Sequence, residues 1–195
     1  MPLSRVCVFC GSSSGFDARY RAAAAGVASA LVARGIEVVY GGGRVGLMGV
    51  VADTALERGG SVTGVIPKGL FAREVGHTGL TTLHEVASMH ERKTLMYDLS
   101  DAFIALPGGF GTLEELAEVT TWAQIGLHQK PVALLDVDGF WDGLVTQLDR
   151  MVTEGFLRVE NRRLVATYDD IESMLDGLES WIPSPAEKWI DDDER

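Results

Sequence analysis

The segment AFIALPGGFGTLEEL, residues 102–116, contains the pattern that decides the fold of this chain. Residues 102–106 form an apolar run with the length of a buried strand, and Pro107 ends it. The glycines that follow allow the backbone to turn and to approach a bound group closely, because they carry no Cβ atom. A helical pattern at 112–127 completes a strand, glycine loop and helix, which is the repeating unit of a parallel α/β sheet.

The same unit recurs along the whole chain. Strands are expected at 6–9, 36–40, 62–66, 82–85, 102–106, 132–135 and 164–167, and helices at 17–34, 47–58, from Ser88 onward, 112–127, 140–154 and 171–178. This alternation predicts a single-domain, Rossmann-like α/β fold, with a doubly wound, mostly parallel sheet and helices on both faces. We assign residues 1–180 to this domain and 181–195 to a C-terminal extension.

The composition favours a protein that acts on small molecules. The 195 residues are 46% hydrophobic, and 17 Lys and Arg face 28 Asp and Glu, for a net charge of −11. This charge disfavours binding to a nucleic-acid polymer, which requires clustered cations. Since there is neither a leader segment nor an apolar run of the roughly 18 to 20 residues that a membrane helix needs, we expect a cytoplasmic protein with no membrane partner.

The cysteines and histidines do not form a metal-binding pattern. Cys7 and Cys10 have the spacing of a redox or zinc motif, but residues three apart in a strand point to opposite faces. We interpret both as core residues in a reducing compartment. The four histidines lack ligand spacing, so no metal site is expected.

Three loops rich in glycine or serine follow predicted strands, where ligands of open parallel sheets bind. Loop 107–112 is the strongest candidate, because the amides at a helix start attract anions. Loop 41–46 resembles GxGxxG, but no acidic residue ends its strand, which disfavours NAD or FAD; a tight turn explains it equally well. Loop 11–15 offers hydroxyls to a nucleotide or is simply a turn.

Glu115 has two interpretations. Thr112 and Glu115 have the spacing of a capping box, in which Glu115 would bond back to the helix start; the alternative is a catalytic role. In both cases we expect the helix start to keep Glu115 ionised at neutral pH. An ionised carboxylate suits stabilisation of a developing cation or orientation of water.

Arg92 and Lys93 follow the predicted N-terminus of the helix at Ser88, where Glu91 completes a capping-box spacing. Charged pairs on a helix usually face solvent. Here the neighbouring residues are apolar, and an arginine beside an apolar stripe favours an anionic partner.

Three motifs occur in order, namely GGGRVGLM at 41–48, MHERK at 89–93 and PGGFGTLEE at 107–115. Together they resemble the Lonely Guy family of cytokinin riboside 5′-monophosphate phosphoribohydrolases, and the similarity extends from about residue 6 to 141. The resemblance implies hydrolysis of the N-glycosidic bond of an N6-substituted or plain adenosine 5′-monophosphate, without a cofactor, in a homodimer or larger assembly. Members have been called lysine decarboxylases, but no lysine here has a context that anchors pyridoxal phosphate.

By this resemblance, Arg92 and Glu115 are the catalytic pair. The implied substrate-binding residues are Glu74, Lys93, Gly108, Gly109, Phe110, Gly111, Thr112, Leu113, Glu114 and Thr121, together with Gly11, Ser12, Gly42, Gly43 and Met48. Phe110 replaces the usual tyrosine and Glu91 the usual glutamine, which leaves the base preference open. The alternative function is a non-catalytic nucleotide or cofactor carrier, which would need the glycine loop but not the charged pair.

Overall fold

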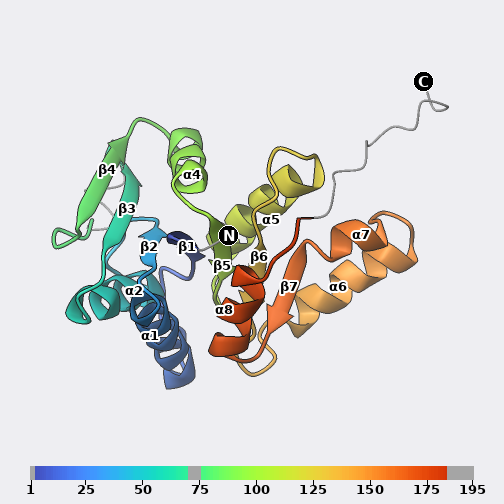
Figure 1. The fold of residues 1–195 in the computed structure, drawn as a ribbon, viewed down its shortest axis with the longest axis horizontal. Helices are drawn as coiled ribbons and strands as arrows, with labels where there is room; N and C mark the ends of the chain where they lie inside the picture. The colour runs from blue at the N-terminus through green and yellow to red at the C-terminus, as the bar shows by residue number, and fades with distance from the viewer. Residues whose placement is uncertain (1–2, 70–75, 184–195) are drawn as a thin grey trace.

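The computed structural model describes residues 3–69 and 76–183, which form one twisted sheet covered by helices (Figure 1). The strands are β1 (Arg5–Phe9), β2 (Glu37–Tyr40), β3 (Val62–Pro67), β4 (Thr82–Val86), β5 (Ala102–Ala105), β6 (Val132–Leu135) and β7 (Val165–Tyr168). All pair in parallel, in the order β4-β3-β2-β1-β5-β6-β7. The predicted doubly wound α/β fold is therefore confirmed.

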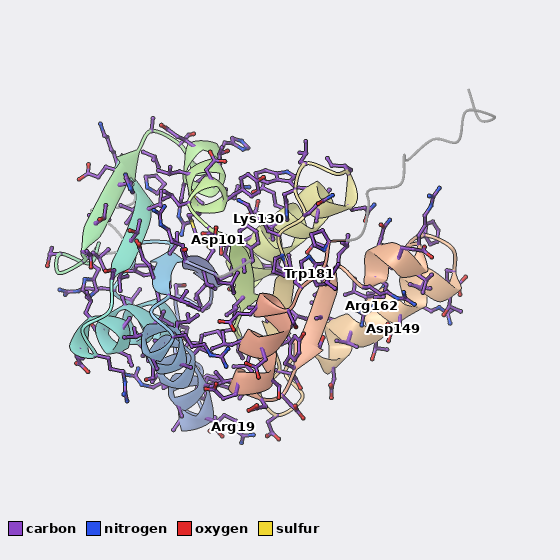
Figure 2. All side chains as sticks on the ribbon, in the orientation of Figure 1. Arg19, Asp101, Lys130, Asp149, Arg162 and Trp181 are labelled. Atoms are coloured by element: carbon purple, nitrogen blue, oxygen red, sulfur yellow. The ribbon has the colours of Figure 1, made fainter. Side chains whose placement is uncertain are left out.

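The described helices are α1 (Ala18–Ala33), α2 (Gly46–Glu57), α4 (Met89–Asp98), α5 (Phe110–Gln124), α6 (Asp142–Thr153), α7 (Val159–Arg162) and α8 (Ile171–Glu179). The short helix α7 was not expected from the sequence. An ion pair of 2.7 Å between Arg162 Nε and Asp149 joins it to α6 (Figure 2). Among the residues described, none of the helices has the length and hydropathy needed to cross a membrane.

The central strands are buried on both faces, as parallel strands between helix layers must be. In β1, Val6 and Val8 pack against α1, α2 and α8, whereas Cys7 and Phe9 pack toward α4 and α5. Cys10 lies in the first of these cores, so the two free thiols are buried on opposite faces, as predicted.

The start of α5 differs from the sequence expectation. The helix begins at Phe110 rather than Thr112, and its N-cap is Gly109, which has no side chain to bond the first turn. Thr112 therefore lies inside the helix, and the capping box predicted for Thr112 and Glu115 does not form. The predicted cap of α4 forms: Ser88 Oγ accepts from Glu91 N at 3.1 Å, while the Glu91 carboxylate accepts from Ala87 N, one residue before the N-cap.

Trp181, the first residue of the predicted C-terminal extension, contacts the rest of the chain. Trp181 donates from Nε1 to the Gln129 carbonyl at 3.0 Å (Figure 2). Residues 184–195 of the predicted extension lie outside the described residues.

Candidate active site

The chain leaves β1 toward one face of the sheet and β5 toward the other, so a crevice opens between their carboxyl ends. A cavity of about 240 Å³ lies there, lined by residues 11–15 and 107–109 with Tyr20, Leu47 and Phe140. The predicted residues Gly11, Ser12, Gly108 and Gly109 are therefore brought together at the position where this class of sheet binds ligands.

Glycine is required where these loops meet. Gly11 N donates to the Pro107 carbonyl at 3.1 Å. A Cβ atom at Gly108 would lie 2.1 Å from Thr112 Oγ1, and one at Gly11 would lie 2.9 Å from the Ser13 carbonyl oxygen. Since Gly109 gives no side-chain cap, the first amides of α5 point past it without an intrahelical acceptor, a geometry suited to an anion.

Arg92 is held in a fixed orientation beside this loop. Its side chain is buried, and Nε donates to the Val65 carbonyl at 3.1 Å while Nη2 donates to the Gly41 carbonyl at 3.3 Å. Nη1 lies 3.6 Å from Glu115 Oε1. The carboxyl ends of β2 and β3 therefore aim the guanidinium of α4 at the carboxylate of α5.

Gly41 makes this arrangement possible, although the sequence analysis assigned site roles only to its neighbours Gly42 and Gly43. A Cβ atom at Gly41 would lie 1.9 Å from Arg92 Nη2. Gly42 and Gly43 instead contact segment 76–77: Gly42 accepts from His77 N at 3.0 Å, and Gly43 forms a bridge with Gly76. In the sequence, only the run of three glycines at 41–43 indicated that Gly41 belongs to the site.

Lys93 forms ion pairs with two carboxylates of α5. Its Nζ bonds Glu114 and lies 2.8 Å from Glu118 Oε1. Burial acts to lower the pKa of Lys93, but the hydrogen bonds that Lys93 donates to Glu114 and Glu118, together with the charges of these carboxylates, outweigh it and raise the pKa, so the ammonium stays charged. Glu118 was not among the residues predicted from the sequence, although its spacing of four residues from Glu114 places both on the same helix face.

Glu115 is less acidic than the sequence suggested. Burial raises the pKa of its carboxyl group to about 7, against the opposing effect of Arg92. The expectation of a fully ionised group failed because α5 starts early. Glu115 therefore lies beyond the first turn, with 12% of its side chain exposed, where desolvation outweighs the helix dipole.

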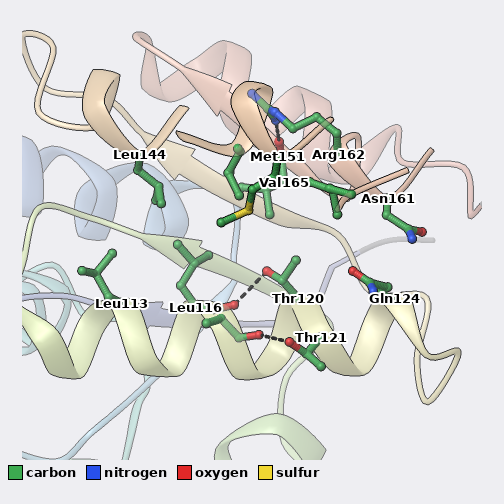
Figure 3. A pocket seen from close by; sticks show the side chains of 13 residues that line it. Leu113, Leu116, Thr120, Thr121, Gln124, Leu144, Met151, Asn161, Arg162 and Val165 are labelled. Atoms are coloured by element: carbon green, nitrogen blue, oxygen red, sulfur yellow. Dashed lines mark hydrogen bonds between the residues drawn. The ribbon is translucent and has the colours of Figure 1, made fainter. Parts of the chain in front are cut away.

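The remaining predicted residues are spread over three places. Leu113 and Thr121 line a different cavity of about 310 Å³ between α5 and α6, and the Thr121 hydroxyl donates to the Ala117 carbonyl (Figure 3). Phe110 is 92% exposed at the start of α5, and Met48 is buried in the core. Glu74 lies outside the described residues.

The described residues contain no group of three or more His, Cys, Asp or Glu side chains that could hold a metal ion. The site therefore offers a buried ion pair of Arg92 and Glu115, and Glu115 belongs to the helix that begins at the glycine loop. This arrangement suits a reaction in which charge develops on a phosphorylated substrate.

A family model described as possible lysine decarboxylase matches residues 48–178. A probable cytokinin riboside 5′-monophosphate phosphoribohydrolase of Oryza sativa subsp. japonica is 50% identical over 179 residues, which cover 92% of this chain and 85% of the relative. A cytokinin riboside 5′-monophosphate phosphoribohydrolase of Arabidopsis thaliana is 49% identical, with coverage of 92% and 84%. The chain belongs to the Lonely Guy family.

Solved structures with the same fold include more distant proteins. A molybdenum cofactor binding protein of Rippkaea orientalis superposes on this Lonely Guy chain with a TM-score of 0.67 at 21% identity, covering 92% of this chain and 98% of the other. The molybdenum cofactor carrier protein of Chlamydomonas reinhardtii gives 0.65 at 19% identity, with coverage of 89% and 94%. At these identities the likeness establishes the fold alone.

Proposed function

We propose that this protein hydrolyses the N-glycosidic bond of adenosine 5′-monophosphate or its N6-substituted forms, releasing the free base and ribose 5-phosphate. The observation that carries the proposal is the buried Arg92–Glu115 pair, whose carboxylate lies in the helix that begins directly after the glycine loop. Relatives of about half-identical sequence are named for this reaction.

The glycine loop and the start of α5 bind the 5′-phosphate in this proposal. The amides after Gly109 and the positive end of the helix dipole supply the attraction, and the absence of Cβ atoms at Gly108 and Gly109 lets the phosphate approach the backbone. Phosphate binding at this point would place the ribose beside Glu115.

Glu115 and Arg92 perform the bond cleavage. As the bond from C1′ to the purine nitrogen lengthens, its electron pair moves to the base and positive charge develops on the sugar, where an ionised Glu115 stabilises it. Water adds its oxygen to C1′ and loses a proton to Glu115, and this proton is then passed on to the departing base, which restores the carboxylate. A carboxyl group with a pKa of about 7 can accept and release this proton at neutral pH.

The environments of Lys93 and Lys130 do not support decarboxylation of lysine, the activity in the description of the family model. Lys93 is bound to two carboxylates, and Lys130 Nζ donates to the Tyr97 carbonyl at 2.7 Å and lies over the Tyr97 ring. Neither amine is placed to form a Schiff base with pyridoxal phosphate.

The active assembly is a homodimer in this proposal, with the cavity between α5 and α6 as its interface. Figure 3 shows Leu113 and Leu116 of α5 facing Leu144 and Met151 of α6 across this cavity. Helix α6 has no buried residue even though its apolar side lines the cavity, so the residues that the structure describes leave its apolar stripe without a covering layer. A second copy seated there would lie against the helix that carries Glu115.

The buried free thiols and acidic charge fit action in the cytoplasm on small molecules rather than on nucleic-acid polymers.

Incubation with AMP and with isopentenyladenosine monophosphate, followed by assay of ribose 5-phosphate, tests the reaction. Release by the wild type, with a Glu115→Gln variant slower by on the order of 10² to 10⁴, is the expected result. A carrier would bind the nucleotide without releasing ribose 5-phosphate, and that outcome would replace the hydrolase proposal.

A further inference from the structure

Glu118 is the residue of the α4–α5 contact to which neither the family resemblance nor the proposed reaction gives a role. Its carboxylate lies 2.8 Å from Lys93 Nζ, and its side chain is 22% exposed, compared with 54% for Glu114. Glu114 and Glu118 are one helical turn apart, so both reach Lys93 from the same side of α5. Glu118 is therefore the more buried of the two anchors of Lys93.

The charges around Glu115 do not balance. Those that face it are the cations Arg92 and Lys93 from α4 and the carboxylates Glu114 and Glu118 from α5. The charge of Glu115 also acts on the thiols of Cys7 and Cys10, but burial, reinforced by that charge, raises the pKa of both, so they stay neutral. Three carboxylates therefore compete for two cations.

This competition has a definite outcome in the structure. Lys93 bonds Glu114 and Glu118, while Glu115 is left with the Arg92 guanidinium at 3.6 Å. The Lys93 side chain is only 10% exposed, so a loss of its anchors would not simply release it into solvent. Lys93 directly follows Arg92 in α4. A Lys93 side chain without its anchors would therefore be drawn toward the negative charge of Glu115.

We propose that Glu118 is a positioning residue, which holds Lys93 away from Glu115 and fixes α4 against α5 so that Glu115 pairs with Arg92 and stays free to accept a proton. The inference rests on the proposed function. Glu118 acts through Lys93 rather than by contact with the reacting atoms.

The test begins with Glu118→Gln, which keeps the shape of the side chain and removes its charge. We expect kcat to fall roughly 10- to 100-fold with a smaller change in KM, because Arg92 and Glu115 lose their alignment. The acid limb of kcat/KM should move to lower pH by roughly 0.5 to 1 unit, since the loss of one carboxylate and the approach of Lys93 both favour ionised Glu115. Glu154→Gln is the matched control, because it removes the exposed partner of Arg150 on α6 and should leave rate and profile unchanged.

A double-mutant cycle shows whether Glu118 acts through Lys93. In a Lys93→Met background, Glu118→Gln should change kcat by less than roughly twofold, whereas independent effects would multiply. An unshifted acid limb in Glu118→Gln, or multiplying effects in the cycle, would overturn the inference. If Glu118→Gln fails to fold by circular dichroism, Glu118→Asp replaces it: the retained charge should hold the acid limb in place while kcat falls, and unchanged kcat would overturn the inference. A wild type that releases no ribose 5-phosphate would instead refute the proposed function.

Discussion

Glu115 combines two properties that a surface carboxylate lacks, namely burial and a single close cationic partner. Burial raises the pKa of Glu115 to about 7, while Arg92 acts in the opposite direction. The ionised form that the proposed reaction uses is therefore formed only as the pH rises through neutrality.

The pH dependence of the reaction follows from this pKa. A group that must be ionised and titrates near pH 7 makes kcat/KM rise with pH, so we expect a roughly tenfold lower value at pH 6 than at pH 8. Initial rates with AMP over pH 5.5 to 9 measure it. The residual activity of Glu115→Gln serves as the control: it should lack this limb while it keeps any effect of substrate phosphate ionisation. A flat wild-type profile would contradict the role of Glu115.

Gly41 gives a second prediction at the level of one residue. Gly41→Ala should lower kcat by roughly 10²-fold, because its Cβ atom would occupy the position of Arg92 Nη2 and move the guanidinium away from Glu115. Gly143→Ala is the matched control, since a Cβ atom there meets nothing within 4 Å. Steady-state kinetics of both variants test this prediction. Equal kcat values for Gly41→Ala and Gly143→Ala would show that the position of Arg92 is not required.

At the scale of elements, the first turn of α4 supports the site. Ser88 caps this helix, and Glu91 Oε2 accepts from Ala87 N at 2.7 Å, so both ends of the cap are bonded just before Arg92 and Lys93.

Loss of this cap should affect both stability and turnover. Ser88→Ala should lower the free energy of unfolding by roughly 0.5 to 2 kcal/mol and reduce kcat at least roughly threefold, because the frayed turn carries Arg92. Asp170→Ala removes the equivalent cap from α8, on the opposite face, where Asp170 Oδ2 accepts from Ser173 N at 3.1 Å. This control should lower stability and leave kcat unchanged. Urea unfolding and kinetics on both variants make the comparison, and an equal loss of kcat in the two would refute a local role for α4.

At the scale of the whole molecule, the open question is what covers the apolar side of α6. Leu148 lines the cavity between α5 and α6, and a charge there would oppose burial against a second copy.

We expect the wild type to have the mass of a dimer and Leu148→Glu to have that of a monomer. Ile182→Glu is the control, because Ile182 is 84% exposed and does not line this cavity. The Ile182→Glu variant should remain a dimer. Size-exclusion chromatography with light scattering measures all three. A monomeric wild type, or a dimeric Leu148→Glu variant, would show that the interface lies elsewhere or does not form.

The positions of strands, loops and helices could be predicted from the sequence because they depend on local patterns. Apolar runs, glycine stops and helical periodicity placed all seven strands and the central helices within a few residues. The motifs around Arg92 and Glu115 pointed to the two side chains that the structure brings to within 3.6 Å. Among the described residues, α7 was missed and the start of α5 was misplaced, the latter because a glycine cap leaves no side-chain signal.

The sequence by itself therefore determined the parallel α/β fold, its glycine-loop edge and the family to which the chain belongs, because each is encoded by neighbouring residues. The tertiary structure decided the proton affinity of Glu115, the orientation of Arg92 by Gly41 and Val65, the capture of Lys93 by Glu118 and the uncovered side of α6. The reason is that burial and charge pairing are set by segments that meet only in the fold: the two carbonyl partners of Arg92 are 27 and 51 residues away from it along the chain.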